Sequence, residues 1–423
     1  MVEYIPLFNN NSGLIYISRN YLPISTFLVI YRVGSRDESR REQGLSHFLE
    51  HMFFKGTSKR NKSDIISKQM DELSAQYNAF TSQEYTGYYF KVKSDNYLRC
   101  LDVWGDMLTD PLLNSKEMKK EKTVVIEELN KYKDDPSRHI HDLLNKCMFN
   151  GHELEHDIGG DNATIQKYTR SLVEKYYQSQ YHLNNVLFCY NGDLTKNQIV
   201  KSIYASNFKK LQVGNRIRIS NNPYQYQNRP KVLVETKKNL KQIHLCIAFP
   251  SPDRYNDERF AGDVLANILG GGMSSRLFAE VREKRGLVYN INAQLQSYED
   301  NGHFCILTAT EPKNLKDLLR IVIQEIEKIC QKLVGVKEFN KNINNLTGQL
   351  VLANEDAFTL MMLYTSQYLF NDDEFYDING MIEQYKKVTR QDVKRFANKY
   401  LNLNNIHIIA MGNITQREIE TIL

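Results

Sequence analysis

The spacing of apolar residues changes from strand-like to helix-like within the first 54 positions of the chain. Segments Gly13–Ile17 and Thr26–Val33 alternate or are continuously apolar and end at Gly34-Ser35, which predicts two strands. Residues 44–54 follow with a helical period of roughly 100° per residue. One face of this predicted helix is apolar and consists of Leu45, Phe48, Leu49, Met52 and Phe53. The opposite face carries His47, Glu50, His51 and Phe54.

The same reasoning predicts a mixed succession of helices and strands up to residue 205. The further predicted helices are 64–74, Ser115–Lys133, Ser137–Met148, Thr164–Tyr181 and Lys196–Ala205, and the strands are a hairpin over 78–92 and Asn185–Asn191. Asn114, with Glu117 three residues later, is a capping-box signal for the helix that begins at Ser115.

After a polar segment rich in turn residues, the order of predicted elements repeats. The second set comprises strands Gln242–Phe249, Tyr289–Leu295 and Gly302–Thr308, with helices Glu258–Leu269 and Lys313–Leu333. The offset from the first half is roughly 210 to 220 residues, which suggests duplication of one α+β unit. We therefore predict two α+β domains, 1–207 and 231–423, joined by a linker at 208–230. Of the two copies, the first carries the His and Glu residues.

Composition limits the function classes. A chain of 423 residues is too long for one ordinary core, and 41% hydrophobic with 25% charged residues describes a globular protein. Lys and Arg number 55 against 50 for Asp and Glu, an excess that gives no case for nucleic-acid binding. No apolar run approaches the ~18 to 20 residues of a membrane span, and no signal peptide is evident. The six cysteines include no C-x-x-C pair, so we expect buried, reduced thiols and a cytoplasmic location.

The polar face of helix 44–54 has the pattern of a metal site. His47 and His51 lie one turn apart with Glu50 beside them, which is the H-x-x-E-H spacing of the inverzincins. Zinc in a hydrolase usually has three protein ligands and a fourth position for water. A surface helix with two solvated histidines would have the same pattern, so a third ligand is needed to decide.

A third ligand is available in helix Ser115–Lys133. Glu121 and Glu128 are seven residues apart and therefore share a face of this helix. With His47 and His51, either glutamate would complete a zinc site, and Glu50 could then take a proton from a water held by the ion. Alternatively, these glutamates are ordinary charges on an exposed helix, since helices are rich in Glu.

These motifs together resemble a known family. H-x-x-E-H, followed after 76 residues by Glu128 and with Glu121 seven positions before it, is similar to the M16 metallopeptidases, which include insulin-degrading enzyme and pitrilysin. The local sequence resembles the mitochondrial processing peptidase β-subunit branch at His47-Phe48-Leu49-Glu50-His51-Met52 and at Phe54-Lys55-Gly56-Thr57.

The resemblance implies one Zn²⁺ per chain on His47, His51 and Glu128, with Glu50 as general base. It implies that Glu121 helps to hold the ligand set. Asn78-Ala79 matches the family's edge strand, which would pair with the backbone of a peptide substrate.

The similarity extends into the second half of the chain. Arg282 and Tyr289 occupy the positions at which the family places an Arg and a Tyr that reach toward the scissile carbonyl. The implied fold is two duplicated α/β-sandwich-like domains that form half of a clam-shell. Since four such domains enclose the substrate, we expect a homodimer, or a heterodimer with a related M16 subunit, that cleaves peptides or unstructured segments.

Two other interpretations compete with this hypothesis. A non-catalytic core or assembly subunit could have the same fold, but such chains usually lose metal ligands, whereas this one has the full set. His152-Glu153-Leu154-Glu155-His156 also satisfies H-x-x-E-H, yet a helix there would have no apolar stripe to bury. We therefore predict that this second motif is not a metal site.

Overall fold

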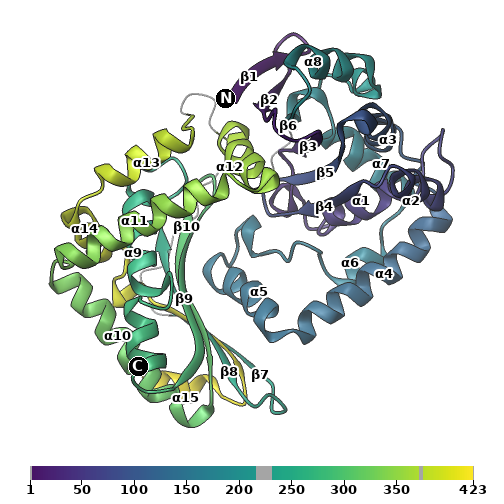
Figure 1. Ribbon diagram of the computed structural model, residues 1–423. Helices are drawn as coiled ribbons and strands as arrows, with labels where there is room; N and C mark the ends of the chain where they lie inside the picture. The colour runs from purple at the N-terminus through teal and green to yellow at the C-terminus, as the bar shows by residue number, and fades with distance from the viewer. Residues whose placement is uncertain (1, 216–230, 371–374, 423) are drawn as a thin grey trace. The chain divides into compact units, whose positions relative to one another are not determined.

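The computed structural model describes residues 2–215, 231–370 and 375–422, which form two compact units. Each unit combines segments from different parts of the chain. As far as these ranges are described, the first unit comprises Met1–Lys131, His156–Asn221 and Asn354–Asp377, and the second comprises Tyr132–Glu155, Asn222–Ala353 and Ile378–Leu423. Each unit contains one β-sheet (Figure 1).

The first unit is built on a six-stranded sheet in the order β1-β2-β6-β3-β5-β4. Its strands are β1 (Val2–Leu7), β2 (Ser12–Ser18), β3 (Ile24–Tyr31), β4 (Gln76–Thr81), β5 (Thr86–Lys93) and β6 (Val186–Gly192). Its helices are α1 (Leu45–Phe53), α2 (Ser63–Glu72), α3 (Tyr97–Thr109), most of α4 (Ser115–Asp134), α6 (Asn162–Gln166), α7 (Arg170–Gln180), α8 (Lys196–Ala205) and α12 (Ala357–Phe370). β4 lies at one edge of this sheet.

The second unit is built on a five-stranded sheet in the order β7-β11-β8-β10-β9. Its strands are β7 (Lys231–Thr236), β8 (Ile243–Ser251), β9 (Val288–Ser297), β10 (Gly302–Thr310) and β11 (His407–Gly412). Its helices include α5 (Pro136–Met148), α9 (Glu258–Gly270), the π-helix η6 (Phe278–Glu283), α10 (Leu315–Gln331), α11 (Val336–Ala353), α13 (Ile378–Lys387), α14 (Arg390–Tyr400) and α15 (Gln416–Ile422).

The two sheets share one topology. Counted from β2 and from β7, the strands follow the spatial order first, fifth, second, fourth, third. In both sheets the first pair is parallel and the other three pairs are antiparallel. The prediction of a duplicated α+β unit is therefore confirmed, and β1 is an addition to the first copy.

Each sheet is covered on one face by a helix from a distant part of the chain. In the first unit, α12 packs against β3 and β6, and its Phe358 contacts Phe80 and Tyr89. In the second unit, α5 packs against β7, β8 and β11, where Cys147 belongs to the same buried cluster as Cys246. Both sheets therefore depend on a segment that is remote in sequence for part of their core.

Most of the predicted elements are present, with one correction. The single helix predicted over Thr164–Tyr181 is wrong, because the chain breaks into α6 and α7. Thr169 caps α7 by accepting a hydrogen bond from the Leu172 amide at 3.2 Å, and this cap starts a new helix.

The predicted domain boundaries describe continuous halves, whereas the compact units exchange two segments. Residues 132–155 belong to the second unit and residues 354–377, as far as they are described, to the first. Of the predicted linker 208–230, residues 216–230 lie outside the described residues. The division at 208–230 stays a prediction.

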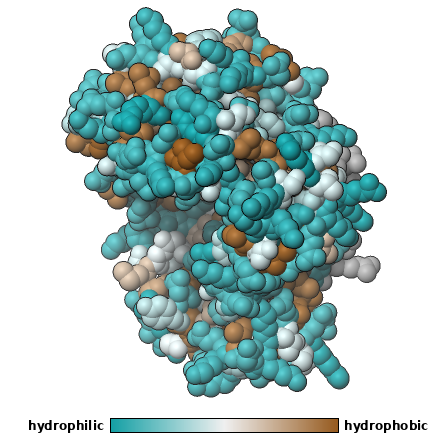
Figure 2. Space-filling model, turned by 90° about the vertical axis from the view of Figure 1, so that its right-hand side faces the viewer, coloured by the Kyte–Doolittle hydropathy of each residue, from teal (hydrophilic) through white to brown (hydrophobic). Residues whose placement is uncertain are grey.

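The face shown in Figure 2 is mostly hydrophilic, with hydrophobic residues in small groups between hydrophilic ones. Five of the six cysteines are buried, as predicted, and Cys330 is half-buried. Among the described helices, none combines the length and the apolar character needed to cross a membrane.

Candidate metal and catalytic site

Helix α1 is fixed at its start by a glycine and a buried carboxylate. Gly44 has φ 88°, and a Cβ there would lie 2.4 Å from the carbonyl oxygen of Gly159. The buried Glu38 accepts hydrogen bonds from the backbone amides of Gly44 at 2.6 Å and Ser46 at 2.7 Å. These two hydrogen bonds satisfy backbone amides at the start of α1 and fix where the helix begins. Burial raises the pKa of Glu38 to about 8.

The apolar face of α1 is buried, as predicted. All of its five residues, Leu45, Phe48, Leu49, Met52 and Phe53, belong to the core of the first unit. Burial of this face sets the rotation of the helix, so the polar face is turned toward α4 and β4. The expectation of a two-sided helix is confirmed for residues 45–53. The placement of Phe54 on the polar face is wrong, because the helix ends at Phe53 and the Phe54 ring packs against Trp104.

The two histidines of α1 point at the same place. Nε2 of His47 and Nε2 of His51 are 3.3 Å apart, and the ring centroids are 4.7 Å apart. The His47 side chain is 12% exposed and that of His51 is 20% exposed. The alternative of two solvated histidines on a surface helix therefore does not hold.

Glu128 of α4 joins the two rings. Its Oε2 lies 3.2 Å from Nε2 of His51 and 3.8 Å from Nε2 of His47. Among the residues that the structure describes, these three form the one group of at least three His, Cys, Asp or Glu side chains with ligand atoms within 4.8 Å of one another.

The donor set fits a tetrahedral zinc ion. Zinc binds imidazole nitrogen and carboxylate oxygen at about 2.0 to 2.2 Å, so two ligand atoms on one tetrahedral ion lie about 3.4 Å apart. The three distances of 3.3, 3.2 and 3.8 Å are close to that separation. Two imidazoles and one carboxylate also leave the fourth position that a hydrolytic site needs.

Burial and charge shift the pKa values of the two histidines in opposite directions. Burial lowers the pKa of His47 to about 4, with a further contribution from the charge of His51. Burial also acts to lower the pKa of His51, but hydrogen bonds to Glu121 and Glu128 outweigh it and raise that pKa to about 9. At neutral pH, the site without metal therefore holds a proton on His51, which an incoming ion must displace.

Glu121 supports His51 from the other side of the ring. Its Oε1 lies 2.9 Å from Nδ1 of His51, and its Oε2 accepts from Nζ of Lys55 at 2.7 Å. Burial acts to raise the pKa of Glu121, but the bonds to His51 and Lys55 outweigh it and lower the pKa. An ionised Glu121 keeps the proton of a neutral His51 on Nδ1 and turns Nε2 toward Glu128.

Glu50 lies on the same face of α1 with one carboxylate oxygen engaged. Its Oε2 accepts a hydrogen bond from Oγ1 of Thr81 at 2.5 Å. Within the described part of the chain, Glu50 makes no other hydrogen bond. Burial raises its pKa, an effect that the Thr81 bond opposes. A carboxylate with a raised pKa and one open oxygen is suited to accept a proton.

Asn78 and Ala79 lie in β4, which pairs with β5 in antiparallel register, Asn78 opposite Tyr89. Since β4 is the last strand of the sheet, its other edge is open for an added strand among the described residues. The side chain of Asn78 accepts from the amide of Ala79 at 2.9 Å.

Arg282 and Tyr289 belong to the second unit, where the structure brings them together. The guanidinium of Arg282 lies 5.0 Å from the ring centroid of Tyr289, and the Tyr289 side chain is 80% exposed. Arg282 stands on the π-helix η6, and π-helices are frequent at functional sites.

The second H-x-x-E-H motif does not form a helical metal site. Glu153–Glu155 is a single 3-10 turn, and the buried His152 accepts the amide of Leu154 on Nδ1 at 3.2 Å. These residues therefore do not form the helix that the missing apolar stripe argued against.

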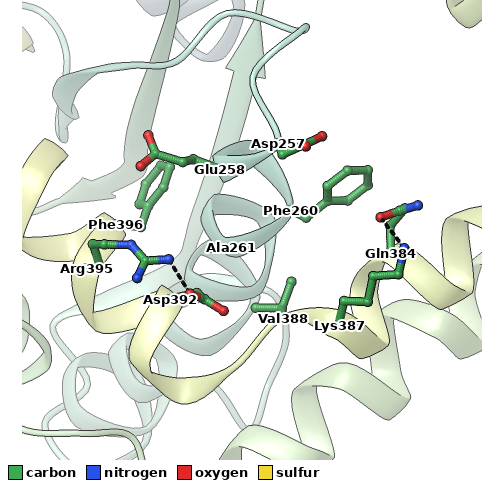
Figure 3. Close-up of a pocket in the computed structure, with 10 residues that line it drawn as sticks. All are labelled: Asp257, Glu258, Phe260, Ala261, Gln384, Lys387, Val388, Asp392, Arg395 and Phe396. Atoms are coloured by element: carbon green, nitrogen blue, oxygen red, sulfur yellow. Dashed lines mark hydrogen bonds and ion pairs between the residues drawn. The ribbon is translucent and has the colours of Figure 1, made fainter. Parts of the chain in front are cut away.

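A pocket of about 300 Å³ in the second unit is shown in Figure 3. It lies between α9, α13 and α14, and none of the predicted site residues lines it. Asp392 pairs with Arg395, and Glu258 accepts from Lys399 and Tyr400. Because these charges are engaged with one another, the pocket offers no catalytic set.

Thr81 and Lys55 were missed by sequence reasoning. Lys55 lies two residues beyond the end of α1, so helical spacing does not place it, and its contact with Glu121 depends on how α4 packs on α1. Nothing in the sequence places Thr81 beside Glu50, because their contact depends on how β4 packs on α1.

Two family models match the chain. Residues 14–162 match insulinase (peptidase family M16), and residues 167–346 match the peptidase M16 inactive domain. The first range includes His47, Glu50, His51 and Glu128.

Curated relatives cover most of the chain. An uncharacterized zinc protease of Streptomyces coelicolor is 30% identical over 380 residues, or 89% of this chain and 82% of the relative. An uncharacterized zinc protease of Bacillus subtilis is 33% identical over 328 residues, 78% of each chain.

Solved structures share the fold. A protease from Helicobacter pylori superposes with a TM-score of 0.88 at 21% identity, covering 97% of this chain and 99% of that one. A protein from Pseudomonas fluorescens, described as a peptidase M16 inactive domain, gives a TM-score of 0.87 at 19% identity, with 98% of each chain covered. From the matched models and the relatives together, the chain belongs to the insulinase family of peptidases, family M16.

Proposed function

We propose that this chain is a zinc-dependent endopeptidase that cleaves peptides or unstructured protein segments. The observation that carries the proposal is the convergence of His47, His51 and Glu128, with Glu50 beside them on the same helix face. The names of the zinc protease relatives agree with it.

The residues divide the work as follows. His47, His51 and Glu128 would hold one zinc ion, and Glu121 orients His51 through Nδ1. Zinc held there would supply Lewis-acid chemistry, which lowers the pKa of water toward neutrality. Glu50 takes the proton from the attacking water and later gives it to the leaving amine.

The substrate is read through its backbone. The open edge of β4 can accept an extended peptide as an additional strand, next to Asn78 and Ala79. A folded protein rarely offers a free extended segment, so unstructured segments are preferred. The sequence between His47 and Thr57 favours a processing-peptidase-like branch within the family.

Arg282 and Tyr289 complete the proposal as donors to the developing oxyanion. The exposed phenol of Tyr289 and the adjacent guanidinium are free to serve a ligand in this way. A chain with two such units also agrees with a partner, either a second copy or a related M16 subunit, that supplies the other half of an enclosing shell.

Metal analysis and cleavage of an unstructured peptide test the proposal. We expect about one zinc per chain, loss of zinc from His47→Ala, and loss of cleavage with retained zinc from Glu50→Gln. A protein that binds no zinc, or that binds zinc and cleaves nothing alone or with a related subunit, would instead be a non-catalytic M16-fold subunit. Retained cleavage in Glu50→Gln would remove Glu50 as the base.

A further inference from the structure

We propose that Thr81 is a positioning residue for Glu50, holding one carboxylate oxygen so that the other is presented to the attacking water. The inference rests on the proposed function, since it concerns the base of that reaction. It adds a residue on β4, the strand that carries Asn78 and Ala79.

The geometry of the contact is specific. Thr81 Oγ1 donates to Oε2 of Glu50 at 2.5 Å, a distance typical of a hydrogen bond to a charged carboxylate. In the described part of the chain, this is the one hydrogen bond that Glu50 makes. Among the described residues, Oε1 of Glu50 therefore has no hydrogen-bond partner that would compete with a water.

Thr81 is itself held by backbone. It is the last residue of β4 and lies opposite Thr86 of β5. The turn that follows is closed by the bond from the Ser82 amide to the Tyr85 carbonyl at 2.8 Å, and the Ser35 amide donates to the Ser82 carbonyl at 3.2 Å. The hydroxyl is thus attached to a fixed strand end.

A glutamate needs such a contact for orientation. Rotation about the last side-chain torsion of Glu is broad and weakly restrained, so α1 alone does not fix the plane of the carboxylate. One hydrogen bond to Oε2 removes most of this freedom and leaves the lone pairs of Oε1 in one direction. A base must lie within hydrogen-bond reach of the proton it takes, so the restraint acts on the reaction rate.

The contact also connects substrate binding with the base. Thr81 follows Ala79 by two residues on the open edge strand. A peptide that pairs with this edge is aligned by the same backbone that holds Glu50. The scissile bond and the base therefore share one reference strand.

The hydrogen bond itself is tested in the metal-free protein. Thr81→Val, Glu50→Ala and the double variant form a cycle of unfolding constants measured in urea, since alanine removes the accepting oxygen. We expect the two sites to be coupled by about tenfold or more, as for hydrogen bonds to charged groups. Thr109→Val is the matched control, because its hydroxyl donates to the Gly105 carbonyl at 2.6 Å, and it should show no coupling to Glu50→Ala. Coupling no larger than that of the control would show that Thr81 and Glu50 do not form this hydrogen bond, and would overturn the inference.

The role is tested in the zinc-loaded enzyme. Thr81→Val should lower kcat by about 10- to 100-fold, a fraction of what a general base contributes, while KM and zinc affinity change less than about twofold. Thr81→Ser should restore most of kcat, and in a Glu50→Gln background Thr81→Val should cost nothing further. Full activity in Thr81→Val, or no recovery in Thr81→Ser, would overturn the inference with the proposed function intact. An inactive, zinc-free wild type would instead overturn both.

Discussion

Replacing Glu121 by glutamine should weaken zinc binding, and the deficit should grow as pH rises. Both oxygens of Glu121 are engaged, one by Nδ1 of His51 and the other by Lys55, and its side chain is 5% exposed. Partners of this kind are typically worth 10- to 100-fold in metal affinity, about 1.4 to 2.7 kcal/mol. Glutamine keeps the shape and removes the charge.

The pH dependence follows from competition between zinc and a proton. In the metal-free protein the pKa of His51 is raised to about 9, so at pH 7 the proton lowers the apparent zinc affinity by roughly 100-fold. Glu121 is one of the groups that raise this pKa. In the variant, His51 is no longer oriented by a carboxylate, which lowers zinc affinity, but its pKa also falls, so protons compete less with zinc. At pH 7 these two effects on the apparent zinc affinity offset each other. Above pH 9 no competition remains and the full deficit appears.

Zinc dissociation constants from chelator competition at pH 7 and pH 9.5 measure this. Glu127→Gln is the control, since Glu127 is exposed on the same helix. Wild-type affinity should rise about tenfold per pH unit up to pH 9 and then level off. A Glu121→Gln deficit that is equal at both pH values, or smaller at pH 9.5, would refute the linkage between Glu121, His51 and the metal.

Three further outcomes are expected. Glu128→Gln should lower zinc affinity by at least about 100-fold, because a carboxylate ligand is lost, while the melting temperature of the metal-free protein should fall little. Unchanged zinc content in metal analysis would argue against Glu128 as a ligand. In the metal-free protein, protonated His51 contributes about 3 kcal/mol to the free energy of unfolding below pH 6.5, and this contribution is lost as pH rises through 9. Urea unfolding should therefore give a lower free energy of unfolding at pH 9.5 than at pH 6, and a higher value at pH 9.5 would contradict the assignment. Gly44→Ala should destabilise the protein by at least about 2 kcal/mol in the same assay, since φ is 88° and a Cβ would meet Gly159. Gly272→Ala is the control and should be nearly neutral, because no atom lies within 4 Å of a Cβ there. Equal effects of the two substitutions would contradict the strain argument.

Helix α1 could be predicted from the sequence because the pattern that defines it lies within the helix itself. Leu45, Phe48 and Met52 recur with the period of a helix, and that period alone fixes which side His47 and His51 occupy. The break between α6 and α7 was missed because the apolar spacing continues across Thr169 and masks the cap.

The sequence could not assign separate roles to Glu121 and Glu128 by spacing alone. Both lie on one face of α4, and either could reach the histidines. The structure separates them through the two nitrogens of one ring: Glu121 meets Nδ1 of His51, and Glu128 meets Nε2. Such a distinction depends on how α4 packs on α1, which is a long-range property, as is the contact between Glu50 and Thr81.

The covering of each sheet by a remote helix has a consequence for biosynthesis. β3 and β6 leave the ribosome long before α12, which shields one of their apolar faces. The first sheet must therefore wait, partly uncovered, until nearly the whole polypeptide has been made, although domains commonly fold in order during translation. The core of the first unit is therefore completed only late in synthesis.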